Sequence, residues 1–282
     1  MLFDRKIRVL LAAAAIAAGP TAIIAPLASG EPRSPVAWPV LVELAPGDFR
    51  YSPSGEFTQA GKPANPRVGA ARIDRRLSIM KDLVSAGDYQ RCVDEGACKS
   101  RDSDDVEFDM PTTMVSWRDA QAYAAWLSAK LHARFRLPTD EEWTFAAGRR
   151  APDEGQRDGA GDDPIARWMD RYARESRQQP TDPTPQRLGS FGVNENGLAD
   201  IAGNVWEWTD TCYTRAALAY DGQSPARVET VNCGVRAVEG RHRTYVSDFI
   251  RDARAGGCAA GVPPSNLGFR LVREEPRSWW MF

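Results

Sequence analysis

Two carboxylates stand close together in the run GLADIAGNVWEWTD, residues 197–210. Asp200 lies early in the run, and Glu207 lies between Trp206 and Trp208. Calcium takes roughly six to eight oxygen ligands, and two carboxylates on one curling loop, with main-chain carbonyls turned inward near a glycine, could supply them. The alternative is that Glu207 pairs with an arginine while the two tryptophans fill the core.

Ionisable side chains gather a second time in RHRTYVSDFIRDARAGG, residues 241–257. His242, between two arginines, could be a general base or a metal ligand in a positively charged pocket suited to an anionic or catecholic substrate; the alternative is a solvated basic loop. Asp252, also flanked by arginines, could be a catalytic acid or part of a surface salt-bridge cluster.

Two further chemistries find little support. Ser247 has no base at a fixed spacing and no nucleophile-elbow glycines, which argues against a serine hydrolase. The other of the 2 histidines, His132, lies at the end of a predicted helix, far from His242 in sequence, so the pattern of two histidines and a carboxylate that holds non-haem iron is not found.

The composition is that of a globular protein. The chain has 282 residues, of which 43% are hydrophobic and 26% charged, and these values predict one domain with a real core. The net charge of -2 and the lack of a basic stripe argue against nucleic-acid binding.

The N-terminus resembles an export signal. Arg5, Lys6 and Arg8 precede the apolar run VLLAAAAIAAG, and cleavage after Gly30 would leave small residues at the cleavage positions. We therefore predict a signal peptide over 1–30, a mature domain over 31–282, and a periplasmic or secreted protein without a stable membrane span. An uncleaved membrane anchor is the alternative.

Cysteine usage agrees with an oxidising compartment. Cys92 and Cys98 can close a small loop, and few further metal ligands lie near them, so a disulfide is predicted. Cys212 could pair with Cys233 across a polar loop, which would leave Cys258 single; pairing of Cys233 with Cys258 remains the alternative.

Hydrophobic patterns place the elements that would carry these groups. We expect a strand, a turn at Pro46 and Gly47, and a second strand within residues 39–53, and a loop over 55–76. Residues 77–97 should begin as a strand and continue as an amphipathic helix whose buried side includes Tyr89, Cys92 and Val93.

Two later helices carry capping signals. Ser116 and Asp119 form a predicted capping box before an apolar stripe, and Thr139 and Glu142 form another before a short helix that ends at Gly148. The first stripe comprises Ala120, Tyr123, Ala124, Leu127 and Leu131, and the second helix buries Trp143, Phe145, Ala146 and Ala147. For residues 149–185 we predict a charged surface segment with one helix candidate around 165–177. From Leu188 onward we predict short strands and turns.

Several motifs occur together in the order found in one family. APGDF, VSAGDYQRCVDEGAC, RLPTDEEWTFAAG, NGLADIAGNVWEWTDTCY and SNLGFRLVRE, between residues 38 and 273, resemble the formylglycine-generating enzyme (sulfatase-modifying factor) family. The resemblance implies a single α/β (α+β) domain with little regular secondary structure, related to C-type lectin folds. Asn266, Gly268 and Arg270 would be architectural, Gly268 in a tight turn and Arg270 paired in the core.

The resemblance also implies a structural calcium. Its ligands would be the side chains of Asp200 and Glu207 and the main-chain carbonyls of Gly203 and Val205.

The family's oxidation chemistry should be absent. It uses copper(I) held by two cysteine thiolates about five positions apart, upstream of the terminal GFR. Counting back from SNLGFR places His242 and Ser247 at those positions, and the family's RGGSW segment reads VEGRHRTY here. We therefore expect neither copper nor formylglycine generation.

Two functions remain open. The first is an exported tailoring or maturation oxidoreductase or isomerase acting on a small molecule or peptide, as in siderophore maturation or in proteins accessory to copper nitrite reductases. The second is a non-catalytic factor that binds a ligand or peptide in the lectin-like cleft.

Overall fold

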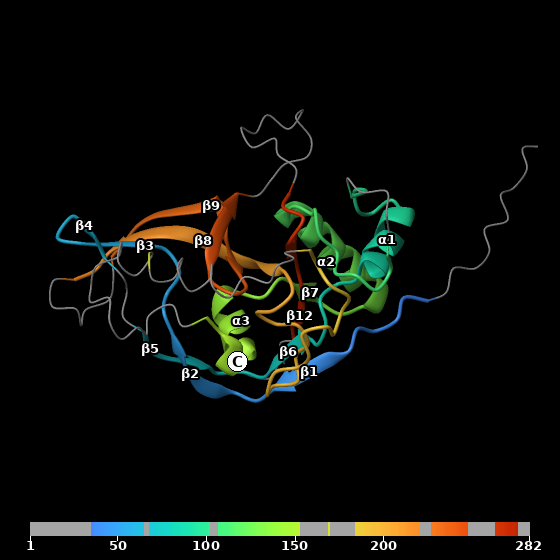
Figure 1. The fold of residues 1–282 in the computed structure, drawn as a ribbon, viewed down its shortest axis with the longest axis horizontal. Helices are drawn as coiled ribbons and strands as arrows, with labels where there is room; N and C mark the ends of the chain where they lie inside the picture. The colour runs from blue at the N-terminus through green and yellow to red at the C-terminus, as the bar shows by residue number, and fades with distance from the viewer. Residues whose placement is uncertain are drawn as a thin grey trace, which may run out of the picture. The chain divides into compact units, whose positions relative to one another are not determined.

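The computed structural model describes residues 35–64, 68–101, 107–152, 169, 184–219, 227–247 and 263–275. Every named element lies in the compact unit Val36–Phe282 (Figure 1). The predicted signal peptide and its anchor alternative fall outside the described residues. Within the described ranges no helix is both long and apolar enough to cross a membrane.

A four-stranded sheet joins the two ends of the domain. Its order is β1 (Leu41–Leu44), β6 (Leu77–Met80), β12 (Val272–Arg273) and β7 (Phe135–Arg136), with antiparallel neighbours throughout. All of β6 is buried, because it lies between two other strands and packs against the core. The strand predicted at the start of residues 77–97 is thereby confirmed.

The segment predicted as a loop over 55–76 instead contains strands. β3 (Glu56–Gln59) and β4 (Lys62–Ala64) form a hairpin, and β5 (Gly69–Ile73) pairs with β2 (Gly47–Tyr51) in a separate two-stranded sheet. Ala60 and Gly61, at the hairpin tip, both have positive φ, which suits a tight two-residue turn. The loop prediction was wrong because these strands are short and half exposed, which leaves little hydrophobic periodicity.

The largest sheet is built around the long hairpin of β8 and β9. Its order is β10 (Thr244–Ser247), β9 (Arg227–Glu239), β8 (Trp206–Ala217), β3 and β4, and β11 (Leu267–Gly268) runs parallel to the start of β8. The sequence predicted short strands here, yet β8 and β9 span 12 and 13 residues. Bulges interrupt their pairing, so the long hairpin carries no continuous alternating pattern.

Two of the three α-helices in the described residues begin where the predicted caps place them, and the third has a cap that was not predicted from the sequence. α1 (Ala86–Asp94) is capped by Ser85, α2 (Trp117–Leu131) has the capping box of Ser116 and Asp119, and α3 (Asp140–Ala147) has that of Thr139 and Glu142. The predicted apolar faces are buried, except that Val93, Leu131 and Phe145 are half-buried. The helix candidate at 165–177 lies outside the described residues apart from Met169.

Two disulfides link the chain. Cys92 bonds to Cys98 at the end of α1, and Cys212 bonds to Cys233 across β8 and β9, as the first of the two predicted pairings had it. Cys258 lies outside the described residues.

Two apolar clusters form the core, one around Tyr123, Trp208 and Phe269 and one around Ile79 and Trp143.

Candidate functional site

The terminal SNLGFR motif locks the start of β8. The main-chain N–H of Trp206 donates to the carbonyl of Asn266 at 2.9 Å, and Gly268 pairs with Glu207. A side chain at position 268 would bring its Cβ to 2.7 Å from the carbonyl oxygen of Thr112. Gly268 therefore permits a close approach of two backbone segments, and the prediction of a tight turn was wrong.

Arg270 and Glu207 form a fully buried ion pair. Nε of Arg270 donates to Oε2 of Glu207 at 2.6 Å, and Nη2 donates to Oε1 at 2.8 Å. The remaining N–H groups of Arg270 reach the carbonyls of Met80, Lys81 and Ala199 at 3.3, 2.8 and 3.0 Å. All five guanidinium donors are thus used, and the predicted core pairing of Arg270 is confirmed.

Asp200 turns back into its own loop. Its carboxylate oxygens accept from the main-chain N–H groups of Gly189 at 2.6 Å and Phe191 at 2.8 Å. Its carbonyl accepts from the N–H of Gly203 at 2.9 Å, and its φ of 58° lies in the left-handed region, where Asp is tolerated more readily than most residues. The loop therefore curls as the sequence suggested.

The donor chemistry of this loop suits a hard cation, but its carboxylates already have partners. Each oxygen of Asp200 and Glu207 accepts one N–H and keeps a second lone pair. Among the described residues no group of three or more His, Cys, Asp or Glu side chains could hold a metal. The predicted calcium set has only two such side chains, with the carbonyls of Gly203 and Val205, and so it stays a prediction.

The rebuilt segment at residues 238–243 holds a buried charge network. Arg243 donates to Glu239 at 2.5 Å and to the carbonyl of Ser52 at 2.7 Å, and its guanidinium lies 3.5 Å from Asp140. Glu239 and Asp140 are buried, and the Arg243 side chain is 7% exposed. Arg243 therefore does not offer its charge to a basic pocket or to solvent, contrary to both readings of the sequence.

Tyr51 and Thr211 complete this network. Tyr51 donates to Oδ2 of Asp140 at 2.6 Å, and the hydroxyl of Thr211 donates to Oδ1 at 2.7 Å. Burial, followed by the charge of Asp140, raises the pKa of the Tyr51 phenol. Burial alone would lower the pKa of Arg243, but Glu239 and Asp140 raise it. Both groups therefore keep their protons at neutral pH, so they can bind and orient but not exchange protons.

His242 lies on the turn between β9 and β10. It is half-buried, and its ring meets that of Trp206 edge to face, with centroids 5.2 Å apart and planes at 75°. Ser247 ends β10, where it pairs with Val235 and is half-buried. The two predicted residues therefore share one short hairpin, whereas Asp252 lies outside the described residues and His132 is the C-cap of α2.

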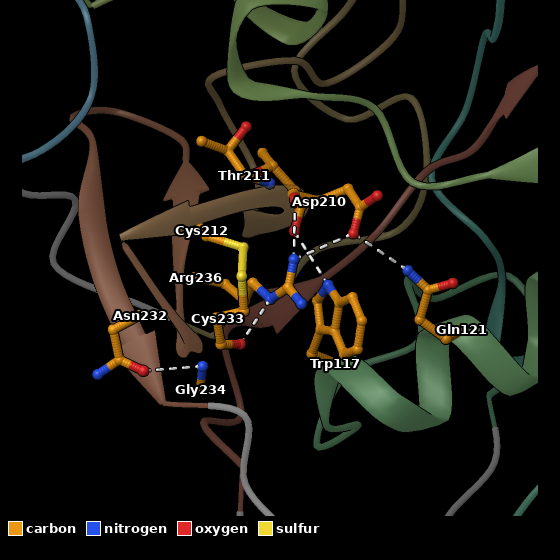
Figure 2. The surroundings of a disulfide bond; sticks show 10 residues. Trp117, Gln121, Asp210, Thr211, Cys212, Asn232, Cys233, Gly234 and Arg236 are labelled. Atoms are coloured by element: carbon orange, nitrogen blue, oxygen red, sulfur yellow. Dashed lines mark hydrogen bonds and ion pairs between the residues drawn. A yellow bond between two sulfur atoms is a disulfide. The ribbon is translucent and has the colours of Figure 1, made fainter. Parts of the chain in front are cut away.

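Two opposing bulges lie beside this hairpin, next to the Cys212–Cys233 disulfide and Arg236 that Figure 2 shows. In the first bulge, residues 209–211 of β8 lie opposite the single residue Ala237 of β9. In the second, residues 233–235 of β9 have no strand-pairing partner on β8, because Cys212 pairs with Arg236 and the next residue, Tyr213, pairs with Asn232. The Cys212–Cys233 disulfide and Arg236 bridge them: Nε of Arg236 donates to the carbonyl of Cys233 at 3.0 Å, and Nη1 donates to the carbonyl of Asp210 at 2.8 Å. The guanidinium also lies 3.8 Å from the ring centre of Trp117.

Asp210, one of the residues in the β8 bulge, is partly exposed. Burial raises its pKa, while the charge of Arg236, whose Nη1 lies 3.1 Å from its Oδ1, opposes that shift. Sequence reasoning did not identify Arg236, Asp140 or Tyr51 as parts of this region. Asp140 sits in the motif RLPTDEEW, but nothing in the sequence links it to residues about 90 to 100 positions away.

Comparisons with known proteins agree with this architecture. The model of the Sulfatase-modifying factor enzyme 1-like domain matches residues 27–275. A formylglycine-generating enzyme of Streptomyces coelicolor is 31% identical over 177 residues, which are 58% of this chain and 52% of the relative. The inactive C-alpha-formylglycine-generating enzyme 2 of Mus musculus is 34% identical over 178 residues, which are 61% and 51% of the two chains.

The chain spans about half the length of these curated relatives. The solved structure of PvdO from Pseudomonas aeruginosa has a TM-score of 0.53 and 20% identity, and the match covers 84% of this chain and 95% of that one, which shows a shared mixed α/β fold. The motif order, the fold and the match over most of the chain give one conclusion: the protein belongs to the sulfatase-modifying factor family of formylglycine-generating-enzyme-like proteins.

Proposed function

We propose that this protein is an exported family member that does not generate formylglycine. The observation that carries the proposal is the state of its cysteines. Four of the 5 are bonded in two disulfides, and counting back from SNLGFR without gaps places His242 and Ser247, not cysteines, where the family's thiol pair is expected. An imidazole and a hydroxyl do not supply the pair of soft thiolates that the family's copper(I) site uses.

Export is supported by the same disulfides. Disulfides form and persist in oxidising compartments and are rare in the cytosol, and the basic and apolar N-terminal run has the composition of a secretory signal. We assign the mature protein to the periplasm or the extracellular space.

The role we favour is that of a tailoring or maturation enzyme, an oxidoreductase or isomerase for a small molecule or peptide. His242 would exchange protons with the substrate, with Asp252 as its acidic partner. Siderophore maturation and assistance to a copper nitrite reductase are the two settings that we consider. His242 supports this role because it is half-buried and an imidazole can both donate and accept a proton.

A specific observation favours the second candidate, a non-catalytic binding factor. The charge of Arg243 is neutralised inside the fold by Glu239 and Asp140, and Tyr51 remains protonated at neutral pH. A surface built from such groups recognises a ligand through fixed hydrogen bonds and needs no proton transfer.

The first experiment tests the absence of formylglycine generation. Mature protein is incubated with copper(I), oxygen and a peptide carrying a sulfatase cysteine motif, and the peptide is analysed by mass spectrometry. We expect no aldehyde, whereas the Streptomyces coelicolor enzyme serves as the positive control. Conversion of the peptide by this protein would contradict the proposal.

A second experiment separates the two roles. Once a bound small molecule or peptide has been identified by mass spectrometry of the protein purified from its native source, His242→Ala and Asp252→Asn are compared with the unaltered protein. Loss of turnover with retained binding supports the enzyme. Binding without turnover in the unaltered protein supports the binding factor.

Calcium is proposed as a structural ion of the loop that contains Asp200 and Glu207. When bound, it would crosslink the loop through oxygen ligands. Elemental analysis of the mature protein, together with the melting temperature before and after chelation by EGTA, tests this. We expect stoichiometric calcium, no copper and a lower melting temperature after chelation; an unchanged melting temperature and no bound calcium would overturn it.

A further inference from the structure

We propose that Trp206 is a positioning residue for His242, so that its indole sets where the imidazole stands at the proposed site. The inference deepens the proposed function and rests on it for its biological meaning. The contacts that carry it come from three places: the indole itself, the strand that holds it, and a glycine on the facing turn.

The indole contacts both the backbone and the side chain of His242. Its Nε1–H donates to the main-chain carbonyl of His242 at 3.1 Å. The two rings also meet edge to face, with centroids 5.2 Å apart, which is a favourable geometry for aromatic pairs. One side chain therefore fixes the backbone of the turn and the orientation of the ring together.

The backbone of Trp206 is itself held firmly. Its N–H donates to Asn266 at 2.9 Å, and it pairs with Leu267 of the parallel strand β11. The next residue, Glu207, is locked in the buried pair with Arg270. Because Trp206 and its neighbour Glu207 are both bound to buried segments, the position of the indole is fixed. It can therefore restrain the more exposed turn that carries His242.

Gly240 leaves the room that the indole occupies. A Cβ at this position would lie 2.9 Å from Cδ1, 3.0 Å from Cγ and 3.1 Å from Nε1 of Trp206. Such contacts are shorter than a side chain tolerates, so any substitution at Gly240 must displace the indole or the turn. Gly240 thus gives a way to disturb the pair without altering either ring.

The two arginines beside His242 are directed elsewhere. Arg241 reaches the carbonyl of Gly203 at 3.4 Å, and Arg243 pairs with Glu239. His242 has the ring contact with Trp206, whereas the guanidinium of Arg243 lies 5.4 Å from the ring centre of Tyr51. Positioning by the indole is therefore separate from the charge network around Arg243.

The test exploits the histidine content of the chain. It has only 2 histidines, so histidine labelled with carbon-13 gives two imidazole signals, with His132 on α2 as an internal reference. The variants are Trp206→Phe, which keeps a ring but loses the N–H, Trp206→Ala, which loses both, and Gly240→Ala. The matched control is Trp117→Phe, because the indole of Trp117 also is half-buried and donates to a main-chain carbonyl, that of Thr209 at 3.1 Å.

The second measurement is the rate at which diethyl pyrocarbonate modifies each histidine, followed by peptide mass spectrometry. We expect Trp206→Ala and Gly240→Ala to change the His242 rate by about threefold or more, with a smaller change in Trp206→Phe. Their His242 signal should shift and broaden, whereas Trp117→Phe should leave it unchanged and His132 should be constant in every variant. Circular dichroism checks that each variant is folded.

An unchanged His242 signal and rate in both Gly240→Ala and Trp206→Phe would overturn the inference, as would an equal change in Trp117→Phe. Neither measurement depends on a substrate. Conversion of the sulfatase peptide would therefore refute the proposed function and leave these results intact. An unchanged His242 signal and rate, without conversion of the peptide, would refute only the positioning of His242 by Trp206.

Discussion

Two buried glutamate–arginine pairs, whose glutamates lie on neighbouring strands, make an informative comparison. Glu207 of β8 and Glu239 of β9 are cross-strand partners, and like charges placed opposite each other destabilise a sheet unless each is neutralised. Arg270 neutralises Glu207 in the retained SNLGFR motif, and Arg243 neutralises Glu239 in the rebuilt segment. Both glutamates are fully buried.

The two sites differ in what surrounds the pair. Arg270 uses its other donors on main-chain carbonyls at Met80, Lys81 and Ala199, so it ties separate segments of the core together. Arg243 meets a second carboxylate, Asp140, and lies on the turn that carries His242. The Arg270 pair therefore ties segments of the core together, whereas the Arg243 pair stabilises the turn that carries His242.

Arg270→Met should show the largest effect. It leaves Glu207 charged and buried with no guanidinium, which should lower the free energy of unfolding by about 3 to 5 kcal/mol. Urea unfolding measures this, and Arg273→Met is the control, because Arg273 pairs with Glu43 at the surface and should cost less than about 1 kcal/mol. Equal losses in both variants would remove the distinction between the retained pair and a surface pair.

Replacing Cys212 and Cys233 together by serine should cost about 3 kcal/mol, because the disulfide closes a loop with a sequence separation of 21. The double replacement of Cys92 and Cys98, whose separation is 6, should cost about 1 kcal/mol less. Hydrogen exchange should also rise in β10 in the first variant, since Ser247 pairs with Val235 in the bridged bulge. Faster exchange confined to α1 would contradict this account.

Arg243→Met also leaves a buried carboxylate, that of Glu239, without its guanidinium. The loss should be smaller than in Arg270→Met, about 2 kcal/mol, because the Arg243 side chain is 7% exposed and Asp140 keeps its bonds from Tyr51 and Thr211. The matched variant Glu239→Gln retains a hydrogen-bond partner for Arg243 and should cost less. Both are measured by urea unfolding. A loss in Arg243→Met larger than that in Arg270→Met would reverse the comparison.

Glu142→Gln should have the smallest effect and should depend on pH. Burial would raise the pKa of Glu142, but the bonds from Arg136 lower it below the usual 4.5. A depressed folded-state pKa stabilises the fold above about pH 4.5, and that contribution is lost as pH falls through the folded-state value. The variant should therefore be about 1 kcal/mol less stable at pH 7 and should lose less stability on acidification.

Glu141→Gln is the control for that experiment. Burial and the neighbouring carboxylates raise the pKa of Glu141, so its ionisation opposes folding above the ordinary value and the variant should not weaken the protein at pH 7. Urea unfolding at pH 7 and pH 4 checks both variants. A loss of acid sensitivity in Glu141→Gln alone would contradict the assignment.

Local signals predicted much of the fold. The capping boxes of Ser116 and Thr139 fixed two helix starts because each is satisfied within four residues of chain. The strands β3, β4 and β5 were missed, because short and half-exposed strands depend on partners from other parts of the chain.

The candidate site was predicted in part. The sequence placed His242 and Ser247 in one segment, and the structure puts them on one hairpin. It did not reveal Tyr51, Asp140 or Arg236, which reach this region from far along the chain. The calcium ligands and the role of Asp252 stay predictions.

The sequence by itself determined the family and two helix caps, because motif order and residue identity are properties of the linear chain. It also predicts that no thiol pair stands upstream of SNLGFR. Only the tertiary structure decided that Arg243 is paired with carboxylates inside the fold, that Glu207 and Glu239 are partners on two neighbouring strands, and that Trp206 lies against His242. The physical reason is that burial and pairing set the behaviour of an ionisable group, and both come from segments that are distant in sequence.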